Sequence, residues 1–153
     1  MTGSRRYPVL DLSAFLVGSW SLHRTILSPE GQRWGEFTGS ASFTPAGEVL
    51  TYGEWGTLRL GGYQGSAFRQ LRYQLTGPGQ AAVYFDYGDF FHELDLREGH
   101  CDTTHPCRDD LYRGEFEVLD ADTWWQCWEV FGPTKNHTLR TEFRRGDSGG
   151  RGM

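Results

Sequence analysis

At 153 residues the chain has the length of one ordinary domain and can bury a sizeable core. Its formal net charge of −5 argues against nucleic acid as the main partner, because phosphate binding requires a cationic face. No apolar run approaches the roughly 18 residues that a membrane-spanning helix requires, so we expect no membrane association.

The composition favours many short strands over long helices. Aromatic residues make up 15% of the chain, and 21 glycines supply frequent turn positions. The three cysteines, Cys101, Cys107 and Cys127, cannot all pair within the chain, which fits a reducing, cytoplasmic setting.

Hydrophobic periodicity predicts one helical turn followed by strands. The helical turn covers residues 10–16. Beyond it, apolar and polar residues alternate, as in strands that are buried on one face. In chain order the alternating segments are 20–27, 34–43, 49–60, 67–75, 81–87, 90–96, 111–119, 123–131 and 137–143. Residues 97–109 contain no large apolar residue and are predicted to form a long loop.

Nine short strands joined by tight turns predict an all-β fold, a single antiparallel up-and-down β-barrel. Closing the sheet removes its exposed edges, and a barrel of about this size can hold one small ligand. A β-sandwich is the alternative, because periodicity does not separate the two. The predicted organisation is a flexible N-terminal tail at 1–9, a barrel domain at 10–145 and a disordered C-terminal tail at 146–153.

Several short motifs resemble known barrel proteins. The Gly18-x-Trp20 pair that opens the first strand resembles the signature of the calycins, meaning lipocalins and their relatives. A longer series of motifs resembles a family of small bacterial proteins known as a domain of unknown function with a lipocalin-like fold. These motifs are Tyr52-x-Glu54-x-Gly56, Phe91-His92, His105-x-Cys107-x-x-Asp110-x-Tyr112 and Trp128-x-Val130-x-Gly132-Pro133-x-Lys135. The resemblance implies a barrel and supplies no reaction.

Strand parity places several polar side chains on the apolar, inward faces. Residues two apart share a face of a strand, so Glu54 lies with Leu50 and Leu58, and His92 lies with Phe90 and Leu94. The same rule turns further ionisable and hydroxyl groups inward: Arg69, Asp110, Lys135, Tyr52, Tyr73 and Tyr112. A buried charge is costly unless it is paired, so we expect these groups either to pair with one another or to contact a ligand.

Each inward group also has a purely structural interpretation. Glu54 and Arg69 could form a buried ion pair, His92 could be a hydrogen-bonded core residue, and the tyrosines could simply pack. On strand 123–131 the inward positions are Trp124, Gln126, Trp128 and Val130. The two tryptophans could floor a site for a flat ligand or fill the barrel, and Trp20 is expected to close its end.

The segment HCDTTHPCRDDLY, residues 100–112, is crowded with potential ligands and proton carriers. Its histidines and cysteines could bind zinc or copper together with His92, although their spacing matches no standard zinc motif. A Cys107–His105 pair could act as a nucleophile and base. The favoured interpretation is a loop over the pocket entrance in which His105, Asp110 and Tyr112 transfer protons while Cys107 packs at the rim.

These observations predict a cofactor-independent acid–base enzyme, an isomerase, cyclase or lyase acting on a partly apolar or aromatic metabolite in the barrel. The predicted catalytic residues are His92, His105, Asp110, Glu54, Tyr112 and Tyr52. The predicted ligand-binding residues are Arg69, Tyr73, Trp124, Trp128, Cys107 and Lys135. Arg69 would anchor an anionic substituent, and the tyrosines would donate to an oxyanion.

Two other classes stay open. A lipocalin-like carrier or sensor would hold a small hydrophobic molecule without altering it, although carriers need few polar anchors. A metal- or haem-dependent barrel would use His92, His105 and Cys107 as ligands. No dinucleotide or phosphate-loop motif is present, so no cofactor is expected. The expected partner is a small molecule, with the protein a monomer or homodimer.

Overall fold

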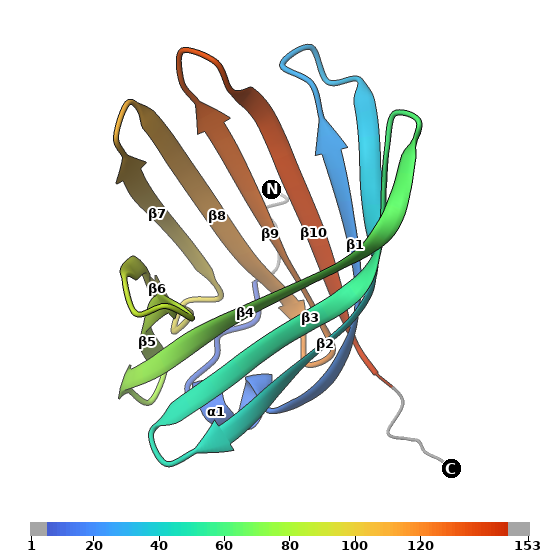
Figure 1. Ribbon diagram of the computed structural model, residues 1–153. Helices are drawn as coiled ribbons and strands as arrows, with labels where there is room; N and C mark the ends of the chain where they lie inside the picture. Colours follow the sequence, from blue (N-terminus) through green and yellow to red (C-terminus); the bar gives the residue numbers. More distant parts are fainter. Residues whose placement is uncertain (1–5, 147–153) are drawn as a thin grey trace, which may run out of the picture.

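Alternating side chains build ten antiparallel strands into one nearly closed up-and-down barrel, in a computed structural model that describes residues 6–146 (Figure 1). The elements are α1 (Leu12–Leu16), β1 (Gly18–Leu27), β2 (Arg33–Ala46), β3 (Val49–Leu60), β4 (Tyr63–Gly77), β5 (Gln80–Phe85), β6 (Phe90–Asp95), β7 (His100–Cys107), β8 (Asp110–Asp120), β9 (Thr123–Phe131) and β10 (Asn136–Arg145). Within the described residues, no helix is long and apolar enough to cross a membrane.

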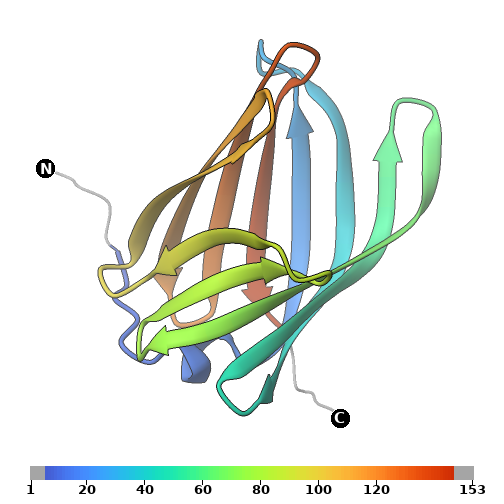
Figure 2. The same cartoon turned by 60° about the vertical axis from the view of Figure 1, so that its left-hand side comes forward.

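Neighbouring strands in the barrel are consecutive in the sequence, except that β1 also pairs with β10. The order is β6-β5-β4-β3-β2-β1-β10-β9-β8-β7, so β1 pairs with β10 and joins the two ends of the chain. β6 and β7 occupy the two ends of this order and are consecutive in sequence, which leaves one seam in an otherwise paired barrel (Figure 2). The predicted barrel is therefore confirmed, with ten strands in place of nine.

The additional strand is β7, and the predicted loop over residues 97–109 is wrong. His100–Cys107 pairs with β8 along its length, from His100 opposite Glu117 to Cys107 opposite Asp110. The inward positions of β7 are small or polar, namely Cys101, Thr103 and His105, so the segment lacks the apolar alternation that identifies a strand. Its pairing partner supplies the order that its own composition does not indicate.

One end of the barrel is closed by α1 and a layer of aromatic side chains. Asp11 caps the helix by accepting a hydrogen bond from the Ala14 backbone N–H at 3.1 Å. The Trp20 indole donates to the Leu16 carbonyl oxygen at 2.9 Å, as expected for a tryptophan that closes the barrel end. Behind it lie fully buried aromatic side chains, namely Trp124, Phe43, Phe116 and Phe143. This half of the interior is solid core.

The chain before α1 bridges the base of the seam. The Val9 N–H donates to the Leu96 carbonyl oxygen at 2.9 Å, just after β6, and the Tyr7 N–H donates to the Val118 carbonyl oxygen in β8 at 3.0 Å. Val9 is buried, so this part of the predicted tail lies against the sheet. The rest of the predicted tails, residues 1–5 and 147–153, lies outside the described residues.

The β1–β2, β3–β4, β7–β8 and β9–β10 hairpins lie at the end of the barrel opposite α1 (Figure 2), and the inward side chains become more exposed toward this end. Along β3 the inward side chains change from Leu50, fully buried, through Glu54, 3% exposed, to Leu60, 41% exposed. β1 shows the same gradient from Trp20 to a partly exposed Ile26. The lumen is therefore closed at the α1 end and open at the hairpin end.

Two glycines allow β2 and β3 to approach closely within the barrel wall. Gly39 lies opposite Gly56, and a β-carbon added to Gly56 would come within 2.7 Å of the Gly39 α-carbon and strike the Thr38 carbonyl oxygen. We predict that Gly56→Ala lowers the free energy of unfolding by about 1–3 kcal/mol, because backbone atoms must shift. Urea denaturation measures this loss.

The matched control is Gly53→Ala, three residues earlier in β3, where an added β-carbon has no neighbour within 4 Å. Alanine there is expected to leave stability unchanged or slightly raised, because glycine weakens a strand interior. Equal losses in the two variants would contradict the proposed close approach.

Candidate functional site

A layer of polar side chains crosses the barrel between the aromatic core and the open half. It surrounds a cavity of about 10 Å³, close to the space that one water requires. The lining residues come from both sides of the barrel: Arg24, Tyr52, Glu54, Arg69, Leu71, Tyr73, Phe91, His92, Gln126 and Trp128. The structure thus brings together six of the predicted site residues, namely Tyr52, Glu54, Arg69, Tyr73, His92 and Trp128.

The centre of this layer is a bidentate ion pair between Arg24 of β1 and Glu54 of β3. Arg24 Nη1 lies 2.8 Å from Glu54 Oε2, and Nη2 lies 3.0 Å from Oε1. Arg24 Nε also donates to the Thr141 hydroxyl of β10 at 2.8 Å. The pair spans β2 diagonally: Arg24 lies opposite Phe37 and Glu54 lies opposite Ala41, and the inward residue of β2 between these two is Gly39, which has no side chain. Three strands are therefore connected through one guanidinium.

The ion pair keeps Glu54 ionised. Burial alone would raise the pKa of Glu54, but the hydrogen bonds and positive charge of Arg24 outweigh burial and hold the pKa below its ordinary value. The Tyr52 hydroxyl donates to Glu54 Oε1 at 2.5 Å. Both carboxylate oxygens are thus engaged by protein donors, which makes Glu54 a fixed negative charge and a poor proton carrier.

The two tyrosines of the layer stay protonated. Burial, followed by the negative charge of Glu54, raises the pKa of Tyr52 well above its ordinary value. Burial also raises the pKa of Tyr73, whose side chain is 2% exposed. Both phenols therefore act as neutral hydrogen-bonding groups: Tyr52 donates to Glu54, and Tyr73 lines the cavity.

His92 is a neutral imidazole of the layer with one ring nitrogen that has no hydrogen-bond partner among the described residues. Its side chain is 2% exposed, and burial lowers its pKa to about 4, so the imidazole is neutral near pH 7. Nδ1 lies 2.8 Å from the Glu93 carbonyl oxygen. Because a carbonyl only accepts, Nδ1 carries the hydrogen, and Nε2 keeps its lone pair on a ring that lines the cavity.

Arg69 brings a second positive charge to the layer. It lies opposite Glu54 in the register of β3 and β4, but the carboxylate turns toward Arg24 instead. The expected Glu54–Arg69 pair is therefore replaced by Glu54–Arg24. The Arg69 guanidinium carbon lies 5.8 Å from the centre of the Phe91 ring, and Arg69 has no hydrogen bond or ion pair with any residue in the range 6–146.

His105 and Tyr112 lie beside the layer and do not line its cavity. They face each other across β7 and β8, with ring centres 5.9 Å apart. His105 also packs edge-on against Phe91, at 5.2 Å, and Phe91 contacts His92 at 4.7 Å. A phenylalanine ring thus contacts both histidines, and the predicted role of His105 as a proton carrier remains a prediction.

The remaining predicted site residues lie apart from this layer. Asp110 and Lys135 form an ion pair at the hairpin rim, with 3.8 Å between Oδ2 and Nζ, and Cys107 is exposed beside them. Trp124 is fully buried in the closed half, against Phe143. None of these four lines the polar cavity.

The potential metal ligands do not gather where the sequence suggests. Within the described part of the chain, one cluster has three metal-binding side chains, formed by His100, Asp102 and Glu115. His100 Nε2 already lies 3.0 Å from Glu115 Oε2. His92, His105 and Cys107 do not form such a group among residues 6–146.

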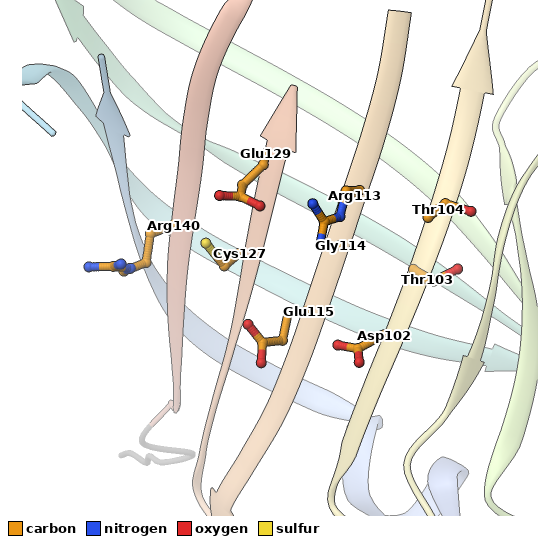
Figure 3. A pocket seen from close by; sticks show the side chains of 9 residues that line it. All are labelled: Asp102, Thr103, Thr104, Arg113, Gly114, Glu115, Cys127, Glu129 and Arg140. Atoms are coloured by element: carbon orange, nitrogen blue, oxygen red, sulfur yellow. The ribbon is translucent and has the colours of Figure 1, made fainter. Parts of the chain in front are cut away.

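A larger hollow, of about 740 Å³, lies on the outer wall over β7–β10 (Figure 3). Its lining residues are Asp102, Thr103, Thr104, Arg113, Gly114, Glu115, Cys127, Glu129 and Arg140. Charges of both signs meet here, with Arg113 opposite Glu129 in register. Exposed and balanced charges are typical of a solvated wall, so this hollow is a weaker candidate than the lumen.

The structure adds four residues to the predicted site, namely Arg24, Leu71, Phe91 and Gln126. Arg24 shares the parity of Trp20 and Leu22, so the periodicity already contained this signal. Gln126 was expected to face inward and proves to line the cavity. Phe91 turns inward because the register shifts between Val83 and Tyr84, which a regular alternation cannot reveal. Phe90, expected to face inward, is 46% exposed for the same reason.

Comparison with solved structures shows the same fold at low sequence identity. The S-type phycobiliprotein lyase CPES from Guillardia theta matches 94% of this chain and 96% of its own, with 12% identity and a TM-score of 0.68. A DUF3598 protein of unknown function from Nostoc punctiforme matches 94% of this chain and 53% of its own, with 14% identity and a TM-score of 0.61. EF1p2_mFAP2b, solved bound to DFHBI, matches 90% and 99%, with 12% identity and a TM-score of 0.50.

No curated protein matches the sequence significantly. A family of unknown function, DUF6314, matches residues 16–145, which include the whole polar layer and all ten strands. The chain therefore belongs to the DUF6314 family, whose fold here is a ten-stranded, nearly closed up-and-down barrel.

Proposed function

We propose that this protein binds a small, partly apolar or aromatic organic molecule in the open half of its barrel and transfers a proton on it with His92 as the base. The carrying observation is the His92 imidazole that lines the cavity, whose Nδ1 is held by the Glu93 carbonyl at 2.8 Å while Nε2 has no hydrogen-bond partner among the described residues. A base needs an unengaged lone pair and a fixed tautomer.

The surroundings of His92 suit a flat ligand above the polar layer. Its ring centre lies 4.7 Å from that of Phe91 and 5.2 Å from that of Trp128. Arg69 and the Tyr73 hydroxyl, both on β4, offer donors to a charge that develops on the substrate. The reaction types that fit are those isomerisations, cyclisations and lyase-type eliminations that begin with removal of a proton from the substrate.

The structural neighbours support small-molecule binding and no particular reaction. CPES is named a phycobiliprotein lyase, and EF1p2_mFAP2b was solved with the ligand DFHBI. At 12% identity these likenesses concern the fold, so they make a lumen ligand plausible for this chain without naming it.

A non-enzymatic carrier is the second candidate, and one observation favours it. Glu54 is saturated by Arg24 and Tyr52, and Asp110 lies at the rim, so His92 is left without a carboxylic acid partner in the layer. A carrier needs only the binding site and no proton relay.

Untargeted mass spectrometry distinguishes the two candidates. Purified protein is incubated in D₂O with the protein-free small-molecule fraction of a cell extract. We expect the wild type to deuterate or consume at least one compound, and His92→Gln to leave that compound unchanged while the urea midpoint shows that it is folded. The control is His23→Gln, since His23 lies on the outer face of β1 beside Glu36.

Equal turnover by the wild type and His92→Gln would contradict the assignment of the base. Absence of any turnover, with one compound retained unaltered through dialysis, would support the carrier. Absence of both turnover and retention would contradict ligand binding altogether.

A further inference from the structure

The polar layer carries more positive than negative charge. Of the residues described, Glu54 is the one carboxylate that lines the cavity, whereas two guanidiniums, those of Arg24 and Arg69, line it. His92 is neutral near pH 7. The layer therefore has two positive charges and one negative charge, an excess of one positive charge inside a barrel whose net charge is −5.

Glu54 cannot serve both arginines. Its Oε2 accepts from Arg24 Nη1 at 2.8 Å, and its Oε1 accepts from Arg24 Nη2 at 3.0 Å and from the Tyr52 hydroxyl at 2.5 Å. Arg69 therefore keeps its five N–H donors without an acceptor among the described side chains. Arg69 is partly exposed, so its donors can be reached by a ligand from the open half, and a planar fork of donors is matched by an oxyanion.

The groups around Arg69 define the rest of the ligand. Phe91 lies under the guanidinium at 5.8 Å, and Phe91 stacks on Trp128 at 5.1 Å between ring centres. Toward the hairpin end the inward positions of the same strands are apolar or small and partly exposed, namely Leu58, Ala67 and Leu139. A ligand in the open half would therefore have the Arg69 guanidinium below it and apolar side chains around it.

We propose that the ligand of this barrel is an organic anion, a flat or apolar body that carries one carboxylate or comparable oxyanion, and that Arg69 binds this anionic group. The inference rests on the proposed binding of a small molecule in the lumen and adds the chemical class of that molecule. Arg69 acts as the specificity-determining residue, and the aromatic rings of Phe91 and Trp128 contact the ligand body.

Two fluorescent probes with one skeleton test the charge preference: 8-anilinonaphthalene-1-sulfonate, which carries a sulfonate, and N-phenyl-1-naphthylamine, which does not. Both are titrated into the full-length chain carrying Phe68→Ser, because Phe68 is 67% exposed on the outer wall and could bind either probe there. We expect the anionic probe to bind at least about tenfold more tightly than the neutral one, as a charged hydrogen bond implies.

The variant Arg69→Gln is expected to lower the affinity for the anionic probe by about tenfold or more and to leave the affinity for the neutral probe unchanged. The matched control is Arg72→Gln on the exposed face of the same strand, which removes an equal charge outside the lumen and should change neither affinity. Removing an unpaired charge is not expected to lower the urea midpoint of Arg69→Gln, which verifies that the variant folds.

Tight binding of both probes with no effect of Arg69→Gln would overturn the anion inference and leave lumen binding intact. Equal weakening by Arg69→Gln and Arg72→Gln would also overturn it, because long-range charge would then explain the effect. If the Phe68→Ser chain with Arg69 intact binds neither probe, both the inference and the proposed function are contradicted.

Discussion

Replacing Arg24 by methionine is expected to lower the free energy of unfolding by about 3–5 kcal/mol at pH 7, because it leaves a buried carboxylate without its counter-ion. The side chain of Glu54 is 4% exposed and that of Arg24 is 15% exposed, so solvent screens this pair little. The Thr141 hydroxyl loses its donor from Arg24 Nε as well. Urea denaturation, with the slope checked for two-state behaviour, measures the loss.

The double variant Arg24→Met with Glu54→Gln provides the control. Removing both charges together is expected to restore most of the loss, to within about 1 kcal/mol of the wild type, since a buried ion pair contributes little beyond what its desolvation costs. Additive losses from the two single changes would contradict coupling between Arg24 and Glu54.

The effect of pH gives the Arg24 prediction a second test. The folded-state pKa of Glu54 is below its ordinary value, so the ionised carboxylate contributes stability above the unfolded-state pKa and loses it as the pH falls through the folded-state pKa. In Arg24→Met the carboxyl is no longer held ionised. The difference between the free energies of unfolding of the wild type and Arg24→Met should therefore become smaller as the pH falls below the ordinary carboxyl range.

The barrel and half of its polar layer follow from strand parity, because a closed sheet converts alternation into inside and outside. Glu54, Arg69 and His92 occupy inward positions that the sequence already indicates. Strand parity does not predict which residue forms the ion pair with Glu54. Register places Arg69 opposite Glu54, yet the bond forms to Arg24, two strands away, across a stretch of β2 where Gly39 has no side chain.

Two further errors have the same physical origin, namely that neighbouring strands override local composition. β7 forms although its inward residues are small or polar, since β8 supplies a complete ladder and the seam strand needs no apolar signal. Phe91 turns inward through a bulge between Val83 and Tyr84, which one sequence cannot show. Asp110 lies at the rim because it begins β8 directly after the β7–β8 turn, and it forms an ion pair there with Lys135.

The interior has three successive levels: an aromatic core that stabilises the fold, the polar layer, and a partly exposed inner face on which a ligand would bind. Buried aromatics such as Trp20 and Trp124 fill the α1 end and leave no space for a ligand. The polar layer lies above them, and the partly exposed inner face beyond it opens to solvent. A ligand that enters from the hairpins therefore meets Arg69 and His92 before it meets the core.

Acidification between pH 6.5 and about 4 is expected to destabilise the protein through His92, by roughly 3 kcal/mol in all. Burial, with a further contribution from the positive charge of Arg69, lowers the pKa of His92 from 6.5 to about 4, while the bond to the Glu93 carbonyl opposes this change. The unfolded chain therefore binds a proton that the folded chain refuses over this range, so stability rises with pH through it and is complete above about 6.5.

Comparison of the wild type with His92→Gln isolates this contribution from the other titrating groups. The difference between their free energies of unfolding, measured in urea at half-unit steps from pH 7.5 to about 4, should shift by roughly 3 kcal/mol in favour of the variant at the acid end. His23→Gln, which removes an exposed histidine beside Glu36, should show no comparable shift. Parallel curves for the wild type and His92→Gln would mean that His92 already takes up its proton in the folded barrel, and the neutral base on which the proposed reaction depends would be lost.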